Sequence, residues 1–287
     1  MRKDDKLKAL RKIYCAMLAA RLIDEIENSY TLQGKAFFHV SGAGHEAVAA
    51  LSPHLIPSDW LHCHYRDKAL MLARGLQPKA FFDSLFCNSA SHSQGRQMNA
   101  HMSAAELNLL SIVGPVGNNA LQAVGVAMAV KSHQDKPIVL SAMGDGSTQQ
   151  GEVLEAIGEA VRSCLPVLFF IENNRYSIST ETPGNTFFSL PNAERAASFY
   201  GIAIHYINGQ DAAQAYAELG PIIHTMRETR QPAIVVFEVE RLSSHTNADE
   251  HTIYRSSKEL ESIQQADPVK ILAEHLTNQD IAAAALD

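Results

Sequence analysis

Cysteine is scarce in this chain of 287 residues, and its four cysteines lie far apart. They are Cys15, Cys63, Cys87 and Cys164. None forms a Cys-x-x-Cys pair, so the spacing argues against a disulfide framework and against a thiolate zinc site. We therefore expect reduced thiols. The group at residues 62–64 (His-Cys-His) invites a metal assignment, but adjacent strand residues point to opposite faces, which favours a structural role.

Long apolar runs are also missing. No segment has the roughly 20 consecutive apolar residues that a membrane span requires. The first 35 residues carry many charges and no continuous apolar core or cleavage site, so they are not a signal peptide. Apolar residues at Leu10, Ile13, Met17 and Leu18 recur at helical intervals and predict an amphipathic helical arm over residues 1–35. We expect a cytoplasmic chain with no membrane partner.

An excess of positive charge is absent as well. The chain has 24 lysines and arginines against 31 acidic residues, a net charge of −7, and no long basic run. This pattern argues against a nucleic-acid partner. No Pro-, Gly- or Ser-rich linker divides the sequence, which predicts a single domain over residues 1–287 that ends in a helical segment, 258–287.

What the chain does contain is a pattern of strand, helix and strand in its centre. Residues 137–143 and 166–171 are short apolar runs typical of buried parallel strands, and residues 152–163 between them have helical character. A right-handed crossover would bring the carboxyl ends of both strands to one edge of a sheet, where open α/β folds bind ligands. The pattern therefore predicts an α/β fold.

Asp145 and Asn174 follow these two strands, twenty-nine positions apart. Carboxylate, amide and carbonyl oxygens are ligands that magnesium prefers, with diphosphate oxygens and water completing the octahedron. Gly144 and Gly146 permit a tight turn and close backbone approach. Each motif alone would be an ordinary turn or loop. Together, at this spacing, they predict one magnesium diphosphate site.

Gly-Asp-Gly at 144–146, twenty-six intervening residues and Asn-Asn at 173–174 resemble the thiamin diphosphate signature. The string at 144–180 is similar to the alpha subunit of the first components of 2-oxo acid dehydrogenases. Five further segments resemble that family in order: 41–50, 64–75, 95–103, 114–131 and 243–255. Of these, GRQM at 95–98 is closest to branched-chain members. The resemblance implies the thiamin diphosphate-binding fold, a doubly wound, mostly parallel sheet flanked by helices.

The resemblance also implies which residues hold the cofactor. Tyr65 and Arg66 match residues that approach the diphosphate, and the planar arginine fork suits phosphate oxygens. Gly114 and Val116 match positions that support the bent cofactor, although Val116 could equally fill the core. The full set expected at the cofactor is Tyr65, Arg66, Gly114, Val116, Gly144, Asp145, Gly146, Ser147, Asn174, Tyr176 and His245. Asp145, Asn174 and the backbone carbonyl of Tyr176 are the expected magnesium ligands.

Two histidines are implied to be catalytic. His245 matches the histidine that positions or protonates the reaction intermediate, and His101 matches one near the active-site channel. The chain departs from several family members just before His245, where it has Ser243 and Ser244 in place of a further histidine or a glycine-proline pair. This departure leaves the hydrogen-bond partner of the diphosphate open.

The implied activity is oxidative decarboxylation of a 2-oxo acid, dependent on thiamin diphosphate and magnesium, with acyl transfer to a lipoyl group on an acyltransferase. A branched-chain 2-oxo acid is favoured over pyruvate or acetoin. A beta subunit or fused beta domain, in a heterotetramer, would supply the glutamate that activates the cofactor, so the chain alone is expected to be inactive. A noncatalytic subunit is the alternative. A nicotinamide-dependent oxidoreductase is disfavoured because no Gly-x-Gly-x-x-Gly pattern is placed between a first strand and helix.

Overall fold

The computed structural model describes residues 3–284 and is built around a six-stranded sheet of order β1-β2-β3-β8-β7-β6. Neighbouring strands are parallel except at the edge, where β6 runs antiparallel to β7. A two-stranded antiparallel pair joins β4 and β5. The strands are β1 (Trp60–His62), β2 (Val139–Gly144), β3 (Val167–Asn173), β4 (Tyr176–Ser177), β5 (Thr180–Glu181), β6 (Ser198–Phe199), β7 (Ile202–Asn208) and β8 (Ala233–Glu238).

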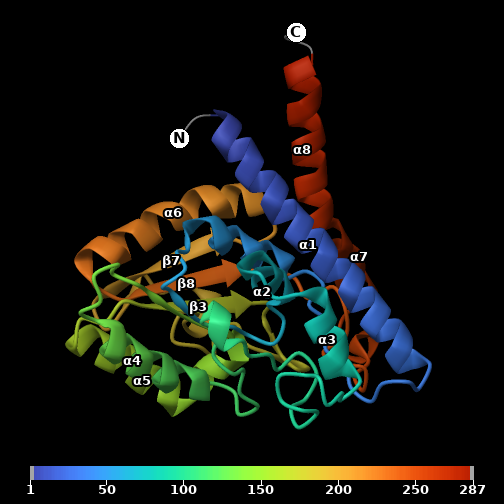
Figure 1. Ribbon diagram of the computed structural model, residues 1–287, viewed down its shortest axis with the longest axis horizontal. Coiled ribbons are helices and arrows are strands. Elements are labelled where there is room, and N and C mark those ends of the chain that lie inside the picture. Colours follow the sequence, from blue (N-terminus) through green and yellow to red (C-terminus); the bar gives the residue numbers. More distant parts are fainter. Residues whose placement is uncertain (1–2, 285–287) are drawn as a thin grey trace.

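Helices cover both faces of the sheet (Figure 1). The α-helices are α1 (Lys3–Leu32), α2 (Lys68–Arg74), α3 (Pro78–Leu85), α4 (Asn118–Val130), α5 (Gly151–Arg162), α6 (Ala212–Thr229), α7 (Ser257–Gln265) and α8 (Pro268–Ala284). Short 3₁₀ helices are η1 (Glu46–His54), η2 (Ala105–Leu107), η3 (Asp145–Gln149), η4 (Pro191–Ala193) and η5 (His251–Ile253). Because strand side chains alternate between faces, β3 sends Phe169 to the α4 and α5 side and Phe170 to the α1 and α6 side. The predicted doubly wound, mostly parallel α/β sheet is confirmed.

The central strand, helix and strand unit forms as predicted. β2 and β3 pair in parallel, with Met143 opposite Ile171 and Gly144 opposite Glu172. Between them α5 buries Val153, Ala156, Ile157 and Ala160 on one stripe, the i, i+3, i+4, i+7 spacing of an amphipathic helix. The strands therefore end side by side, and the loops that follow them start at the same edge of the sheet.

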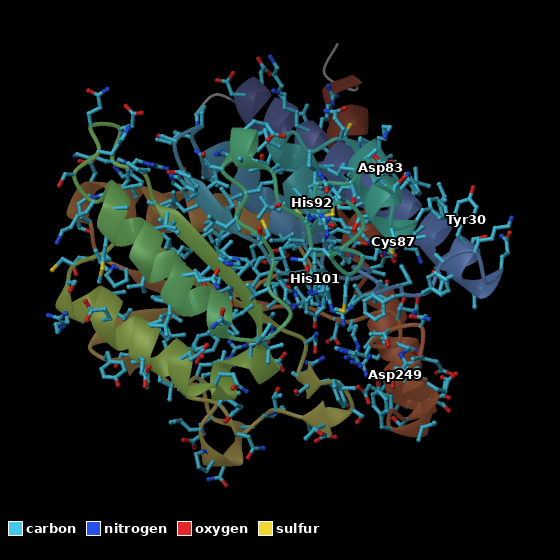
Figure 2. The ribbon with its side chains drawn as sticks, turned by 60° about the horizontal axis from the view of Figure 1, so that its bottom comes forward. Tyr30, Asp83, Cys87, His92, His101 and Asp249 are labelled. Atoms are coloured by element: carbon cyan, nitrogen blue, oxygen red, sulfur yellow. The ribbon has the colours of Figure 1, made fainter. Side chains whose placement is uncertain are left out.

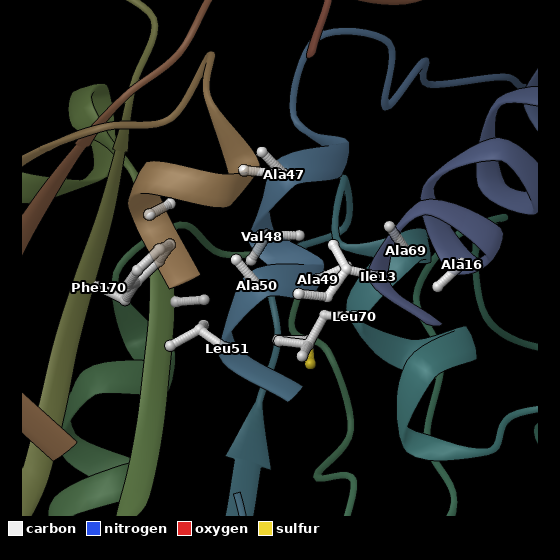
Figure 3. Close-up of a cluster of buried hydrophobic side chains, with 14 of the residues drawn as sticks. Ile13, Ala16, Ala47, Val48, Ala49, Ala50, Leu51, Ala69, Leu70 and Phe170 are labelled. Atoms are coloured by element: carbon white, nitrogen blue, oxygen red, sulfur yellow. The ribbon is translucent and has the colours of Figure 1, made fainter. Parts of the chain in front are cut away.

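The helical arm predicted at the amino terminus is α1, and it packs instead of projecting freely. Leu10, Ile13 and Met17 are buried against η1 and α2, and Leu18 is partly buried. Figure 3 shows Ile13 among the small side chains of η1, whose alanines allow this close packing. Arg21 also joins α1 to the start of α8, with Nη1 and Nη2 donating to the Asp267 carboxylate at 2.9 and 3.1 Å.

The carboxyl-terminal segment is helical as far as the structure describes it, through α7 and α8. Figure 1 shows α8 beside α1. Within residues 3–284, no helix combines the length and apolarity needed to cross a membrane.

Candidate active site

Asp145 occupies the turn directly after β2. Its carboxylate is 1 % exposed, and Thr182 Oγ1 donates a hydrogen bond to Oδ2. Burial raises the pKa of Asp145 to about 6, and the donors from Thr182 and the turn's own N–H groups, with the charge of Arg241, oppose the rise. A bound cation would stabilise the charged form of this buried carboxylate.

The second expected ligand segment lies against this turn. A Cβ atom on Gly146 would be 2.6 Å from Cβ and 2.5 Å from Oγ of Ser177 in β4, so the two chain segments touch. Asn174 is buried beside them, and its Oδ1 accepts the N–H of Tyr176 at 3.1 Å. One lone pair of that oxygen remains free for a cation. The structure thus brings the turn of Asp145 next to the segment of Asn174 and Tyr176.

Three arginines form a buried positive wall beside the Asp145 turn. Arg66, Arg241 and Arg255 are 2 %, 0 % and 3 % exposed. Arg241 Nη2 donates to the Ile178 carbonyl at 2.9 Å and to the Tyr254 hydroxyl at 2.6 Å. Arg255 Nη1 donates to the Arg241 carbonyl at 2.8 Å, and its guanidinium lies over the Tyr176 ring.

Some N–H groups of these arginines have no hydrogen-bond partner. Nε of Arg241, and Nε and Nη2 of Arg255, are buried without a hydrogen-bond partner, although Arg255 Nε lies 3.4 Å from Glu259. Burial and the neighbouring charges of Arg66 and Arg255 lower the pKa of Arg241. Buried charged donors without partners are costly. An anion with several oxygens, such as a diphosphate, would satisfy them.

His245 has a defined protonation state in this setting. Arg66 Nη2 lies 3.0 Å from its Nδ1 and also donates to its backbone carbonyl at 3.0 Å. Because a guanidinium can only donate, Nδ1 is the acceptor and the neutral ring carries its proton on Nε2. Burial, Arg66 and Arg241 lower the pKa of His245 to about 4. At neutral pH the ring therefore offers one N–H donor.

His101 has the opposite tautomer. Its Nδ1 lies 3.0 Å from the Asn99 carbonyl, which can only accept, so Nε2 carries the lone pair. The ring stacks on Tyr65 with centroids 6.0 Å apart, and burial lowers the pKa of His101. His101 and Asp249, which lie on two different loops, are both labelled in Figure 2. Asp249 Oδ2 accepts the N–H of His245 at 2.7 Å, which holds the second loop.

A family model and several relatives match this chain. The family model for the dehydrogenase E1 component matches residues 14–286. The chain belongs to the dehydrogenase E1 component family. Relatives include the 2-oxoisovalerate dehydrogenase alpha subunit of Bacillus subtilis, 30 % identical over 90 % of the chain and 78 % of the relative. The 3-methyl-2-oxobutanoate dehydrogenase alpha subunit of Mycobacterium tuberculosis is 28 % identical over 97 % of the chain and 73 % of the relative.

A third relative is 2-oxoisovalerate dehydrogenase subunit alpha 2, mitochondrial, of Arabidopsis thaliana. It is 29 % identical over 87 % of this E1 chain, but the match covers 53 % of the relative. The E1 chain thus spans about half the length of the first plant relatives it matches.

The remaining expected residues of the E1 chain lie on the same side of the Asp145 turn. Val116 is 47 % exposed, so the alternative that it fills the core is wrong. It lines a shallow hollow with Tyr65 and Ser147. Gly114 is exposed nearby on the same loop, with no atom within 4 Å of a Cβ at that position. Ser244, where the sequence differs from several family members, stabilises its own loop, because its Oγ accepts the N–H of His251 at 3.1 Å.

Several residues at this site were not predicted. Arg241 is one, and His45 is another: its Nε2 lies 3.4 Å from Asn174 Nδ2, and its Nδ1 faces Glu172. The position of Arg241 in the sequence could have indicated it, since it follows β8 at the sheet edge where β2 and β3 also end. His45 is separated from its partners by more than 120 positions, and no spacing rule links them.

The close contact at Gly146 predicts that a larger residue at this position weakens cofactor binding. Gly146→Ala should weaken binding of thiamin diphosphate with magnesium by roughly tenfold, because the new methyl group must push β4 away from the Asp145 turn. Gly151→Ala is the matched control, since a Cβ there meets nothing within 4 Å. Calorimetric titration of both variants measures the difference. Equal affinities would show that the close approach does not shape the site.

Proposed function

We propose that the chain is the alpha-type component of a thiamin diphosphate- and magnesium-dependent 2-oxo acid dehydrogenase. The main support for the proposal is that a buried carboxylate and buried arginines lie together at one edge of the sheet. A cation would stabilise the buried Asp145 carboxylate, and an anion would satisfy the unpaired donors Arg241 Nε and Arg255 Nη2. A magnesium diphosphate group supplies both.

The residues present fit that group. Asp145, Asn174 and the Tyr176 carbonyl would hold magnesium, while Arg66, Arg241 and Arg255 would face diphosphate oxygens. The thiazolium of the bound cofactor supplies a carbanion and accepts the electrons released when the 2-oxo acid loses carbon dioxide. His245 would donate its Nε2–H toward the reacting carboxylate or hydroxyl, and His101 Nε2 would accept a proton or hydrogen bond nearby.

The proposed substrate is a branched-chain 2-oxo acid. The names of the relatives support it, since they specify 2-oxoisovalerate and 3-methyl-2-oxobutanoate dehydrogenase alpha subunits. The proposed partners are beta sequence, which would supply the activating glutamate in a heterotetramer, and a lipoyl-bearing acyltransferase that accepts the acyl group. Cytoplasmic location is part of the same proposal.

The test is calorimetric titration of the chain with thiamin diphosphate and magnesium, with and without beta sequence. Asp145→Asn should lower the affinity roughly ten- to hundredfold, because a buried contact to a charged group contributes about 1.5–3 kcal/mol. Asp135→Asn changes an exposed aspartate and should bind like the unmodified chain. Equal binding by the Asp145 and Asp135 variants would remove the site assignment.

A further inference from the structure

A second group of buried polar side chains adjoins the candidate active site, because it includes Glu172, which pairs with Gly144. His64, Asp67 and Glu172 each place one possible ligand atom within 4.8 Å of the other two, and the group includes the unpaired atoms His64 Nδ1, Asp67 Oδ1 and Glu172 Oε1. The three side chains are 8 %, 0 % and 0 % exposed. None of these three atoms has a hydrogen-bond partner. Buried polar atoms nearly always have a hydrogen-bond partner, so three unpaired atoms in one place indicate that a ligand binds between them.

Each carboxylate is anchored by one oxygen and leaves the other free. Asp67 Oδ2 accepts the backbone N–H of His64 at 2.7 Å, and Oδ1 has no hydrogen-bond partner. Glu172 Oε2 pairs with Nδ1 of the buried His45, while Oε1 is free. Such outer partners orient metal ligands and fix which atom faces the metal.

The supporting elements are rigid. His64 and Asp67 begin and end a tight turn closed by the Asp67 N–H and the His64 carbonyl at 3.0 Å. Glu172 lies in the middle of the sheet on β3, paired with Gly144 on one side and Phe237 on the other. His64 Nδ1 and Glu172 Oε1 are 3.4 Å apart, which is about the edge of a tetrahedron with bonds of about 2.1 Å to nitrogen and oxygen.

No side-chain cation fills this space, in contrast to the other histidine–carboxylate group among the described residues. That group is Asp24, Glu27 and His39, and the Lys68 ammonium occupies it, 2.7 Å from Asp24 Oδ1. The hydrogen bonds of the neighbouring cation Arg66 go to Ser41 and His245.

We propose that His64, Asp67 and Glu172 bind one divalent transition-metal ion of the Mn²⁺, Co²⁺ or Zn²⁺ type. One imidazole nitrogen and two carboxylate oxygens suit these ions, whereas magnesium prefers oxygen alone. The ion ties the turn of Tyr65 and Arg66 to the end of β3. This site is separate from the proposed magnesium site at Asp145, and it does not depend on the proposed function.

The experiment uses the full chain, stripped with a chelator and titrated with Co²⁺ and Zn²⁺. Metal content, cobalt absorption and native mass give affinity and stoichiometry. We expect one equivalent, and at least a roughly tenfold loss of affinity in His64→Gln, Asp67→Asn and Glu172→Gln. His224→Gln, which changes an exposed histidine, controls for surface binding. Asp145→Asn should keep the cobalt site while it loses thiamin diphosphate with magnesium.

Two results would overturn the proposal. One is that the unmodified chain binds no Co²⁺ or Zn²⁺ at micromolar concentration, in which case a proton shared by the carboxyl groups fills the space. The other is that all three ligand variants bind as well as the His224 variant. If a ligand variant fails to fold, the unmodified chain still decides, because a bound ion raises its melting temperature with the metal concentration. No rise with either ion would count against the site.

Discussion

Replacing His245 with glutamine lowers kcat by roughly 10²–10³ when the chain is assayed with beta sequence, because a preorganised donor is lost where charge develops. The loss in affinity for thiamin diphosphate is smaller than the loss in kcat. The reason is that Arg66 and Arg241, which would face the diphosphate, remain in place. Turnover under saturating cofactor and a separate cofactor titration distinguish the two effects.

His251→Gln is the matched control for His245, because His251 lies in the same loop and is also half-buried. It should change kcat less than about threefold, as surface and loop substitutions outside a site usually do. An equal loss of kcat in both variants would mean that the loop as a whole matters, and it would remove the specific role of the His245 Nε2–H.

The same geometry predicts how His245 responds to pH. Its folded-state pKa of about 4 lies below the ordinary value of 6.5, so the unfolded chain binds the proton more tightly. The contribution of His245 to stability is therefore complete above about pH 6.5 and is lost as the pH falls toward 4. Nitrogen chemical shifts of the His245 ring should show a neutral ring with protonated Nε2 from pH 6 to 8. A titration midpoint near 6.5 would contradict the lowered pKa, and shifts typical of a protonated Nδ1 would contradict the donor role of Nε2.

Local sequence patterns were sufficient for the sheet edge that carries the site. The apolar runs of β2 and β3 and the periodicity of α5 are all contained in one continuous segment, so the parallel pairing and the meeting of the Asp145 and Asn174 segments could be predicted. The GDG and NN spacing predicted that these two segments meet, and the turn of Asp145 does contact β4, which follows Asn174.

The interactions that the sequence did not reveal join distant segments. Arg66 and His245 are 179 positions apart, and His45 and Glu172 are 127 apart. No periodicity connects such pairs, because the contact depends on how the turn after β1 meets the ends of β3 and β8. Val116 was ambiguous for another reason: an apolar loop residue has the same sequence pattern in the core and at a ligand-facing surface, and its 47 % exposure excludes the core.

The second large effect is expected at Arg241. Arg241→Met should weaken thiamin diphosphate binding by roughly 10²–10⁴, since removing one partner of a buried charge pair costs about 3–5 kcal/mol. The cofactor-free chain should lose less stability than this. Methionine gives up the hydrogen bonds to Ile178 and Tyr254, but it also relieves the repulsion of Arg241 with Arg66 and Arg255.

Arg195→Met, at an exposed arginine, is the control for Arg241→Met. Arg195 is largely exposed and pairs with Glu238 at 3.1 Å, so Arg195→Met should alter cofactor affinity less than about threefold. Arg241→Lys keeps the charge but lacks the planar fork, and its affinity should fall between those of the unmodified chain and Arg241→Met. Titration calorimetry and urea unfolding on all three variants separate binding from folding. If Arg241→Met binds the cofactor as tightly as Arg195→Met, the orphaned donors of the buried wall do not face the diphosphate, and the anion must lie elsewhere.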